Sequence, residues 1–330
     1  PRPETGFVVE RAGAPALVAD AVVLATGHRA PLDPLAERWR GPRTRFIADP
    51  WPSLAAFAIA GDEPVVVLGS GLSAIDAVLT LTRGPRSAPI VCVSRHGLLT
   101  RDHAPASAPP PHVDLAPAIE RWRAAPTLRG LVAVIRRAID DAGAWRPVID
   151  AVRPHTARIW AALPVDDAAA FLRHVRPLWE VHRHRMAPGV AAIVDHHARA
   201  GTFRVVAGRV TRVDATATSA TLEVAQRGGG ACTLAASWVV NCTGPGSHHT
   251  PAPPIAGLIA AGALEADPLG LGVVTGERGE AIAGGRPRDD LFVIGTLCKP
   301  RLWESTAVPE LRAQAEIVAR ALVAGRGRVK

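Results

Sequence analysis

Short runs of apolar residues that end at a glycine recur along the chain, and they predict buried strands followed by tight turns. In the clearest case, residues 65–68 (Val-Val-Val-Leu) are followed by Gly69, and helical spacing of apolar residues runs from 74 to 82. The next apolar run, residues 90–93, completes a strand–helix–strand unit of about thirty residues, a length typical of half a dinucleotide-binding domain. The pattern therefore predicts an α/β fold built on a parallel sheet.

The rest of the pattern predicts strands towards both ends and helices in the middle. Residues 7–11 and 21–27 read as strands around a turn at 13–15, with the second strand buried, and prolines and tryptophans at 31–52 indicate a linker. Ala/Arg/Leu-rich stretches between about residues 103 and 200 predict a helical insertion. Further strands are expected at 203–206, 210–213, 221–224, 238–241 and 291–294, and an amphipathic helix at about 308–324.

Composition excludes several classes of function. The chain has 330 residues, 48% of them hydrophobic, so it can bury a core, and its 38 basic and 30 acidic residues give a net charge of +8. The arginines are scattered and have no interleaved aromatic residues, so this charge does not predict nucleic-acid binding. No apolar run reaches the roughly 20 residues of a membrane span, and four separated cysteines without a C-x-x-C predict neither a metal site nor a redox dithiol. We expect a cytoplasmic protein with a small-molecule substrate.

The sequence Gly69-Ser70-Gly71-Leu72-Ser73-Ala74 has the form G-x-G-x-x-A between a strand and a helix. In such a turn the first glycine permits the sharp bend, the second lets a pyrophosphate approach the backbone, and the small third residue keeps helix and strand close. The helix N-terminus favours the phosphate charge. These six residues are therefore predicted to bind a dinucleotide, and the alternative is a glycine-rich turn in an unrelated α/β sheet.

The residues after the second strand bear on which nucleotide is bound. A ribose 2′-hydroxyl calls for an acidic residue there, whereas a 2′-phosphate calls for arginine. The chain has Ser94 and Arg95, followed by His96. NADP is favoured over NAD, and the alternative is an arginine that is merely solvated.

Two other strand ends have a similar sequence, with an apolar strand, a small residue, a threonine and a glycine. They are Ala25-Thr26-Gly27 and the segment that ends at Thr243-Gly244. Each alone is typical of any strand-to-loop turn. Together with the central glycine turn they favour nucleotide binding.

These segments and several others occur in an order that resembles a known family. The segments are A-T-G (25–27), D-P-W (49–51), G-S-G-L-S-A-I-D (69–76), S-R-H-G-L-L (94–99), H-R-H-R-M-A-P (182–188), N-C-T-G (241–244), L-F-V-I-G (291–295) and W-E-S-T-A-V-P-E-L-R-A-Q (303–314). The chain resembles bacterial FAD/NAD(P)-binding proteins related to FAD-dependent urate hydroxylase and aspartate N-monooxygenase. The resemblance implies a doubly wound Rossmann-type flavoprotein with two dinucleotide-binding domains, in which hydride passes from NADPH to FAD and then to oxygen.

The resemblance also implies a domain organisation. Residues 1–60 would be the remainder of the FAD-binding domain with a linker, residues 61–245 the NAD(P)-binding domain with its insertion, and residues 246–330 a return to the FAD-binding domain. Ala25, Thr26 and Gly27 would border FAD, and Gly295, Ser305, Thr306, Ala307 and Val308 would approach the isoalloxazine. For Gly295 the alternative is a plain strand end, and for Ser305 and Thr306 it is an ordinary helix cap.

The chain departs from the family in one respect. No G-x-G-x-x-G turn precedes Gly69, so we expect it to lack the first FAD-binding unit. The leading hypothesis is an NADPH-dependent flavin monooxygenase acting on a small polar or anionic substrate. The alternatives are an inactive nucleotide-binding module and a disulfide reductase, which would need the missing C-x-x-C. Arg183, His184 and Arg185 are candidates for binding an anionic substrate, or else form a solvated basic face; no catalytic residue is identified.

Overall fold

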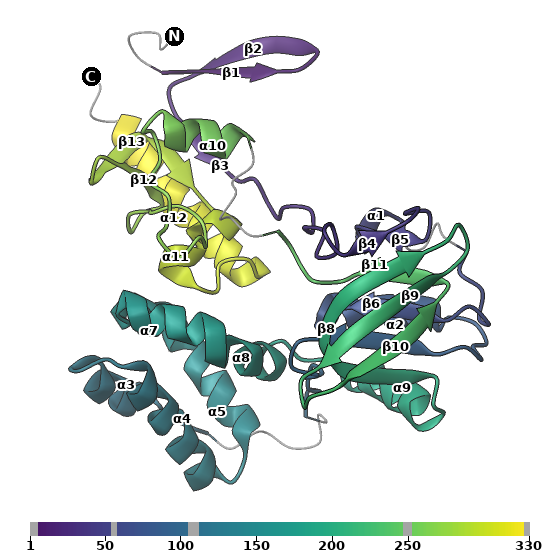
Figure 1. The fold of residues 1–330 in the computed structure, drawn as a ribbon. Helices are drawn as coiled ribbons and strands as arrows, with labels where there is room; N and C mark the ends of the chain where they lie inside the picture. Colours follow the sequence, from purple (N-terminus) through teal and green to yellow (C-terminus); the bar gives the residue numbers. More distant parts are fainter. Residues whose placement is uncertain (1–5, 54–57, 105–111, 247–252, 327–330) are drawn as a thin grey trace.

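The computed structural model describes residues 6–53, 58–104, 112–246 and 253–326. Its largest sheet has a parallel part with strands in the order β8-β7-β6-β11-β5 (Figure 1). These strands are β8 (Phe203–Ala215), β7 (Ile90–Ser94), β6 (Val65–Leu68), β11 (Trp238–Asn241) and β5 (Phe46–Ile47). The order places β6 between β7 and β11, with β8 beyond β7, as in a Rossmann-type fold.

Both faces of this sheet are covered, as its continuous apolar strands require. One face packs against α2 (Leu72–Leu81) and α9 (Pro188–Arg199). The other packs against β9 (Ala220–Gln226) and β10 (Ala231–Ala236), an antiparallel ribbon that continues from β8. All four residues of β6 are consequently buried.

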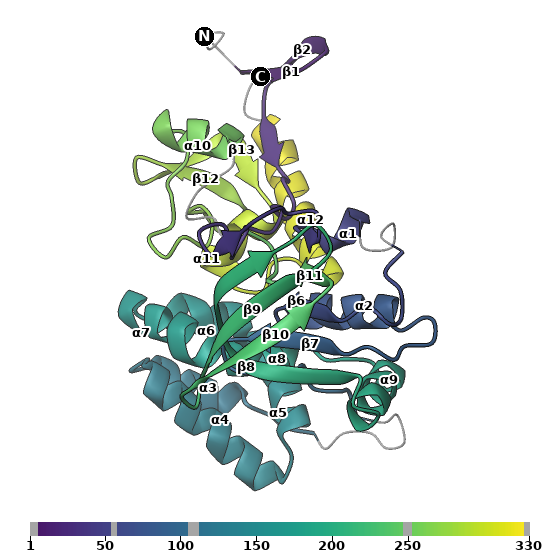
Figure 2. The ribbon, with the colours of Figure 1, turned by 45° about the vertical axis from the view of Figure 1, so that its right-hand side comes forward.

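A smaller sheet combines the two ends of the chain. In it β13 (Arg286–Val293) pairs parallel with β3 (Val22–Leu24) and antiparallel with β12 (Glu280–Ala283). Phe292 of β13 is buried against α12 (Val308–Arg326). The hairpin of β1 (Phe7–Arg11) and β2 (Ala14–Ala19) stands apart at the top of Figures 1 and 2.

Helices and helical turns between residues 116 and 183 form a third unit. They are α3 (Ala116–Arg123), α4 (Leu128–Ala142), α5 (Trp145–Val152), the 3-10 turn η1 (Arg153–His155), α6 (Thr156–Ala162), α7 (Val165–Ala170), the π-helical η2 (Phe171–Val175) and α8 (Arg176–Arg183). Their core also contains Trp303, which follows α11 (Lys299–Leu302), and its ring centroid lies 4.6 Å from that of Trp160 and 5.1 Å from that of Phe171. The helical unit is thus packed against the C-terminal part of the chain. Among the described residues, no helix has the length and hydropathy needed to cross a bilayer.

The α/β class and the elements around the glycine turn are confirmed. The expected linker at 31–52 instead contributes β4 (Trp39–Arg40), β5 and α1 (Pro50–Ser53), because pairing with distant strands orders it. The strand expected to be buried at 21–27 is short, with Val23 37% exposed. The two strands predicted at 203–206 and 210–213 form the single strand β8. Strands β2, β10 and β12 and helix α10 (Pro253–Ala260) were not predicted, and the domain boundaries stay predictions.

Candidate functional site

Gly69 stands where the carboxyl ends of three parallel strands meet. Its φ is +108°, and a Cβ atom there would lie 2.4 Å from the carbonyl oxygen of Cys242, just after β11. Its N–H donates to the carbonyl of Val93 in β7 at 2.8 Å. The fold itself therefore requires glycine at this position.

Gly71 has a different role. It is the N-cap residue of α2, with φ −82° and ψ −170°, and as a glycine it has no side chain with which to cap the helix. Among the described residues, apart from its own chain neighbours, no atom lies within 4 Å of the position a Cβ would take. Ala74, one turn into the helix, is fully buried. The first turn of α2, which includes Leu72 and Ser73, thus presents free backbone N–H groups to an open approach, as a pyrophosphate needs.

The loop after β7 is held against this turn by serine hydroxyls. Ser70 Oγ donates to the carbonyl of Leu98 at 2.6 Å and lies 2.8 Å from Ser94 Oγ. Ser94 Oγ in turn accepts from the N–H of Gly97 at 3.2 Å. Two predicted binding segments are therefore adjacent, and Arg95 projects from this loop as an exposed side chain.

Thr243 and Gly244 follow the third strand end. Asn241 is completely buried, and its amide donates to the carbonyls of Leu32 and Ala48 at 3.0 and 3.1 Å. Its Oδ1 accepts from Thr243 Oγ1 at 2.7 Å. Asn241 was not among the predicted site residues, although the N-C-T-G segment contains it.

The segments expected to border FAD are also brought together. Thr296 Oγ1 donates to the carbonyl of Gly27 at 2.6 Å. Gln314 accepts from the N–H of Gly295 at 2.8 Å and donates to the carbonyl of Ser305 at 2.9 Å. Hydrogen bonds therefore join three segments far apart in sequence. Thr296 and Gln314, which make these bonds, were not among the predicted site residues.

The segment 305–308 leads into α12. The buried Ser305 hydroxyl has no hydrogen-bond partner within the described part of the chain, so it does not cap the helix. Thr306, Ala307 and Val308 are exposed, Val308 by 78%. The N-terminal end of α12 is therefore open to a ligand.

A cavity of about 430 Å³ lies beside Thr26. Its wall includes His28 and Arg29 from the following segment and Leu297 from beyond β13. The other lining residues are Ala30, Pro31, Leu32 and Ile255. Ala25 lies between β3, which ends at Leu24, and the lining residue Thr26. The lining of apolar groups with a cationic side chain suits part of an anionic cofactor.

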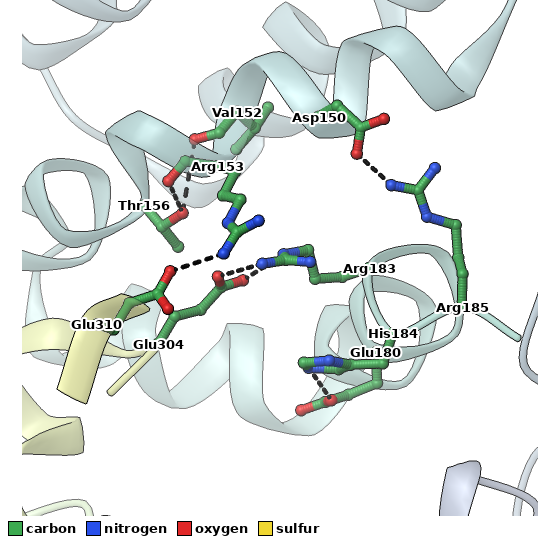
Figure 3. Close-up of polar contacts among 10 residues, drawn as sticks. All are labelled: Asp150, Val152, Arg153, Thr156, Glu180, Arg183, His184, Arg185, Glu304 and Glu310. Carbon is green, nitrogen blue, oxygen red and sulfur yellow. Dashed lines mark hydrogen bonds and ion pairs between the residues drawn. The ribbon is translucent and has the colours of Figure 1, made fainter. Parts of the chain in front are cut away.

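The candidate substrate residues all have partners within the chain (Figure 3). Arg183 donates from Nε and Nη2 to the two carboxylate oxygens of Glu304, each at 2.8 Å. Arg185 pairs with Asp150, and its side chain is 5% exposed. His184 Nε2 lies 3.1 Å from Glu180, and its side chain is 48% exposed. The segment is therefore not the simple solvated basic face considered as the alternative.

Comparisons with known proteins yield structural neighbours only. No protein-family model matches the chain, and no curated protein matches its sequence. Its structure is similar to L-lysine 6-monooxygenase from Pseudomonas syringae, with a TM-score of 0.61 and 17% identity over 99% of this chain and 71% of that one.

Two further neighbours were solved with cofactors. The ornithine N-hydroxylase of Kutzneria sp. 744, in a complex with reduced FAD, NADP+ and L-ornithine, has a TM-score of 0.59 and 12% identity over 97% of this chain and 67% of that one. The FAD-bound cadaverine monooxygenase of Erwinia amylovora has a TM-score of 0.60 and 13% identity over 97% of this chain and 68% of that one. The chain thus has the Rossmann-type fold of FAD-dependent N-monooxygenases. At these identities the likeness establishes the fold alone.

Proposed function

We propose that the protein binds NADPH and FAD and acts as a flavin-dependent oxidoreductase, specifically a monooxygenase for a small polar substrate. The observation that carries the proposal is the contrast between Gly69 and Gly71. The fold requires the first glycine, whereas the second leaves open space at an uncapped helix N-terminus. A turn that served packing alone would not need a glycine at position 71.

Different residues of the chain would bind the two cofactors. The amides at the start of α2 would hold the NADPH pyrophosphate, Ser94 and Arg95 would face its adenosine ribose, and Thr243 and Gly244 would border the same edge of the sheet. Gly27, Gly295 and the segment 305–308 would border FAD, with the N-terminal end of α12 stabilising negative charge on the reduced ring. FAD, when bound, supplies the hydride acceptor and the centre that reacts with oxygen.

The neighbours support the monooxygenase class and a small polar substrate. Their named substrates are L-lysine, ornithine and cadaverine, all small molecules with amino groups. The proposal of an anionic substrate depended on Arg183 and Arg185, whose guanidinium groups already pair with Glu304 and Asp150. We therefore propose a substrate that is small and polar, without a requirement for negative charge.

The test compares two glycines that sit at the starts of helices. Gly71→Ala adds a methyl group where the pyrophosphate would approach, and Gly189→Ala, in the first turn of α9, adds one where space is also open. We expect NADPH affinity, measured by calorimetry, to fall by about tenfold or more for Gly71→Ala only, equivalent to about 1.4 kcal/mol. Unfolding midpoints should stay close to wild type in both. Equal NADPH binding by wild type and Gly71→Ala would contradict the assignment.

A flavin absorbance titration tests the second cofactor. FAD added to the purified chain should show the shifted, structured spectrum of bound flavin, followed by bleaching with NADPH. We expect the affinity for FAD to be weak, because no G-x-G-x-x-G turn precedes Gly69 to hold its pyrophosphate. Bleaching without turnover of small amines would limit the function to a reductase. NADPH binding without any FAD binding would leave only a nucleotide-binding module.

A further inference from the structure

Strand β8 extends beyond the end of β7, the parallel strand beside it in the sheet. Only its first part, Phe203 to Ala207, pairs with β7, and the last pair joins Ser94 to Ala207. The remaining residues, 208–215, continue past the carboxyl end of β7 and pair with β9. The antiparallel ribbon therefore reaches the edge of the sheet where a dinucleotide would lie.

The turn between β9 and β10 returns to this edge and contacts the loop after β7. Arg227, the first residue after β9, donates its N–H to the carbonyl of Ala207 at 2.9 Å. Its Nη1 contacts Nδ1 of His96. Gly97 packs so closely on Ala207 that a Cβ atom would lie 2.7 Å from the Ala207 methyl. Two segments that are 131 residues apart are thus fixed against each other.

The contact concentrates positive charge. Arg209 lies two residues beyond Ala207 on β8, and Arg95 precedes His96; all three arginines are exposed. Burial, and then the charges of Arg227, Arg95 and Arg209, lower the pKa of His96. Within the described part of the chain, none of the three arginines forms an ion pair with a carboxylate, although many other arginines do.

The position of these cations decides what they can bind. The carboxyl end of the second strand of a Rossmann unit lies beside the adenosine ribose, where NADP carries a 2′-phosphate and NAD a hydroxyl. Guanidinium groups bind phosphate oxygens through parallel hydrogen bonds. We infer that Arg209 and Arg227, supplied by the β8–β9–β10 ribbon, join Arg95 in binding the 2′-phosphate and determine the preference for NADPH over NADH.

The inference rests on the proposed dinucleotide site and deepens it. In NADH the 2′-hydroxyl cannot neutralise three converging arginines, so their mutual repulsion remains. Discrimination would therefore come from the ribbon as much as from the loop after β7. The ribbon side chains are specificity determinants and should not affect a coenzyme that lacks the phosphate.

The experiment titrates NADPH, NADH and 2′,5′-ADP against wild type, Arg209→Ala, Arg227→Ala and the control Arg204→Ala. Arg204 is an exposed arginine at the opposite end of β8, so its removal changes the charge equally. Each ribbon variant should bind NADPH and 2′,5′-ADP about tenfold more weakly and NADH unchanged, a loss of about 1.4 kcal/mol in discrimination. Arg227→Lys keeps the positive charge but loses the parallel hydrogen bonds of the guanidinium group. Its affinity for NADPH should therefore lie between those of wild type and Arg227→Ala.

The outcomes separate the two levels of the proposal. Equal losses for NADPH and NADH, or no loss for either, would overturn the role of Arg209 and Arg227 while dinucleotide binding stands. Equal affinity of the wild-type chain for NADPH and NADH would also overturn the role of Arg209 and Arg227. Failure to bind either coenzyme would contradict the proposed function and this inference with it. Circular dichroism and unfolding midpoints verify that every variant is folded.

Discussion

Arg183 and Glu304 form a two-pronged ion pair that joins the helical unit to the C-terminal part of the chain. Both side chains are 14% exposed, so little water competes for the contact. Arg153 and Glu310 form a second pair beside it, with Nη2 3.0 Å from Oε1 (Figure 3). Because Glu304 directly follows Trp303, whose ring is in the helical core, the same short segment is held by packing and by charge. The pair therefore anchors the segment that leads to Ser305 and α12.

Removing this anchor should destabilise the protein. Arg183→Ala leaves the Glu304 carboxylate without its partner, and we expect a loss of about 3 kcal/mol in the free energy of unfolding. Urea denaturation measures it, with the exposed Arg136→Ala on α4 as the control. A double-mutant cycle with Glu304→Ala should give a coupling energy above about 1 kcal/mol. A stable Arg183→Ala variant with weakened substrate binding would instead return Arg183 to the role of a substrate ligand.

Replacing Gln314 should also destabilise the protein, in the region around Gly295 and Ser305. It is 8% exposed and is the hydrogen-bond partner of both the Gly295 N–H and the Ser305 carbonyl. In Gln314→Leu both backbone groups lose these bonds, and each unpaired buried group costs about 1–3 kcal/mol. Hydrogen exchange of the Gly295 amide should accelerate with the loss of stability. Gln314→Glu keeps the acceptor and loses the donor, so it should protect Gly295 better than Gln314→Leu does.

Glu180 predicts a specific acid sensitivity. Burial alone would raise its pKa, but the hydrogen bond from His184 and the charges of His184, Arg176 and Lys299 lower it from 4.5 to about 2. A carboxylate whose pKa is lower in the folded state adds stability above its unfolded pKa and loses it as pH falls to the folded value. We therefore expect the free energy of unfolding to decrease between pH 4.5 and about pH 2, with a shallower decrease in Glu180→Gln. Parallel curves for the two proteins would disprove the contribution of Glu180.

Thiol labelling should distinguish the cysteines. Burial raises the pKa of Cys92, and it raises those of Cys242 and Cys298 to about 12, the nearby Asp76 adding to the effect at Cys242. Thiolate is the reactive form, so these three buried thiols should resist Ellman's reagent in the native protein at pH 8. Half-buried Cys232 should account for the native reaction, and Cys232→Ser should abolish it. All four cysteines should react in guanidinium chloride, and rapid native labelling of more than one would refute the prediction.

The sequence alone determined the parts of the site that depend on neighbouring residues. Strand β6, the turn at Gly69 and helix α2 follow from an apolar run, two glycines and helical spacing within seventeen consecutive residues, 65–81. Such local order needs no knowledge of distant contacts. The class of fold follows from the same unit, because a strand–helix–strand crossover predicts parallel pairing.

Only the tertiary structure decided which distant side chains meet. Arg227 contacts His96 because β8 extends beyond the end of β7 and the turn between β9 and β10 returns to the loop after β7. Arg183 pairs with Glu304 because the neighbouring Trp303 packs among the helices. In sequence these arginines look like any of the others, since an arginine carries the same charge wherever it stands. What pairs one arginine with a carboxylate and another with a histidine is the packing of strands and helices around it, which depends on pairing across more than a hundred residues.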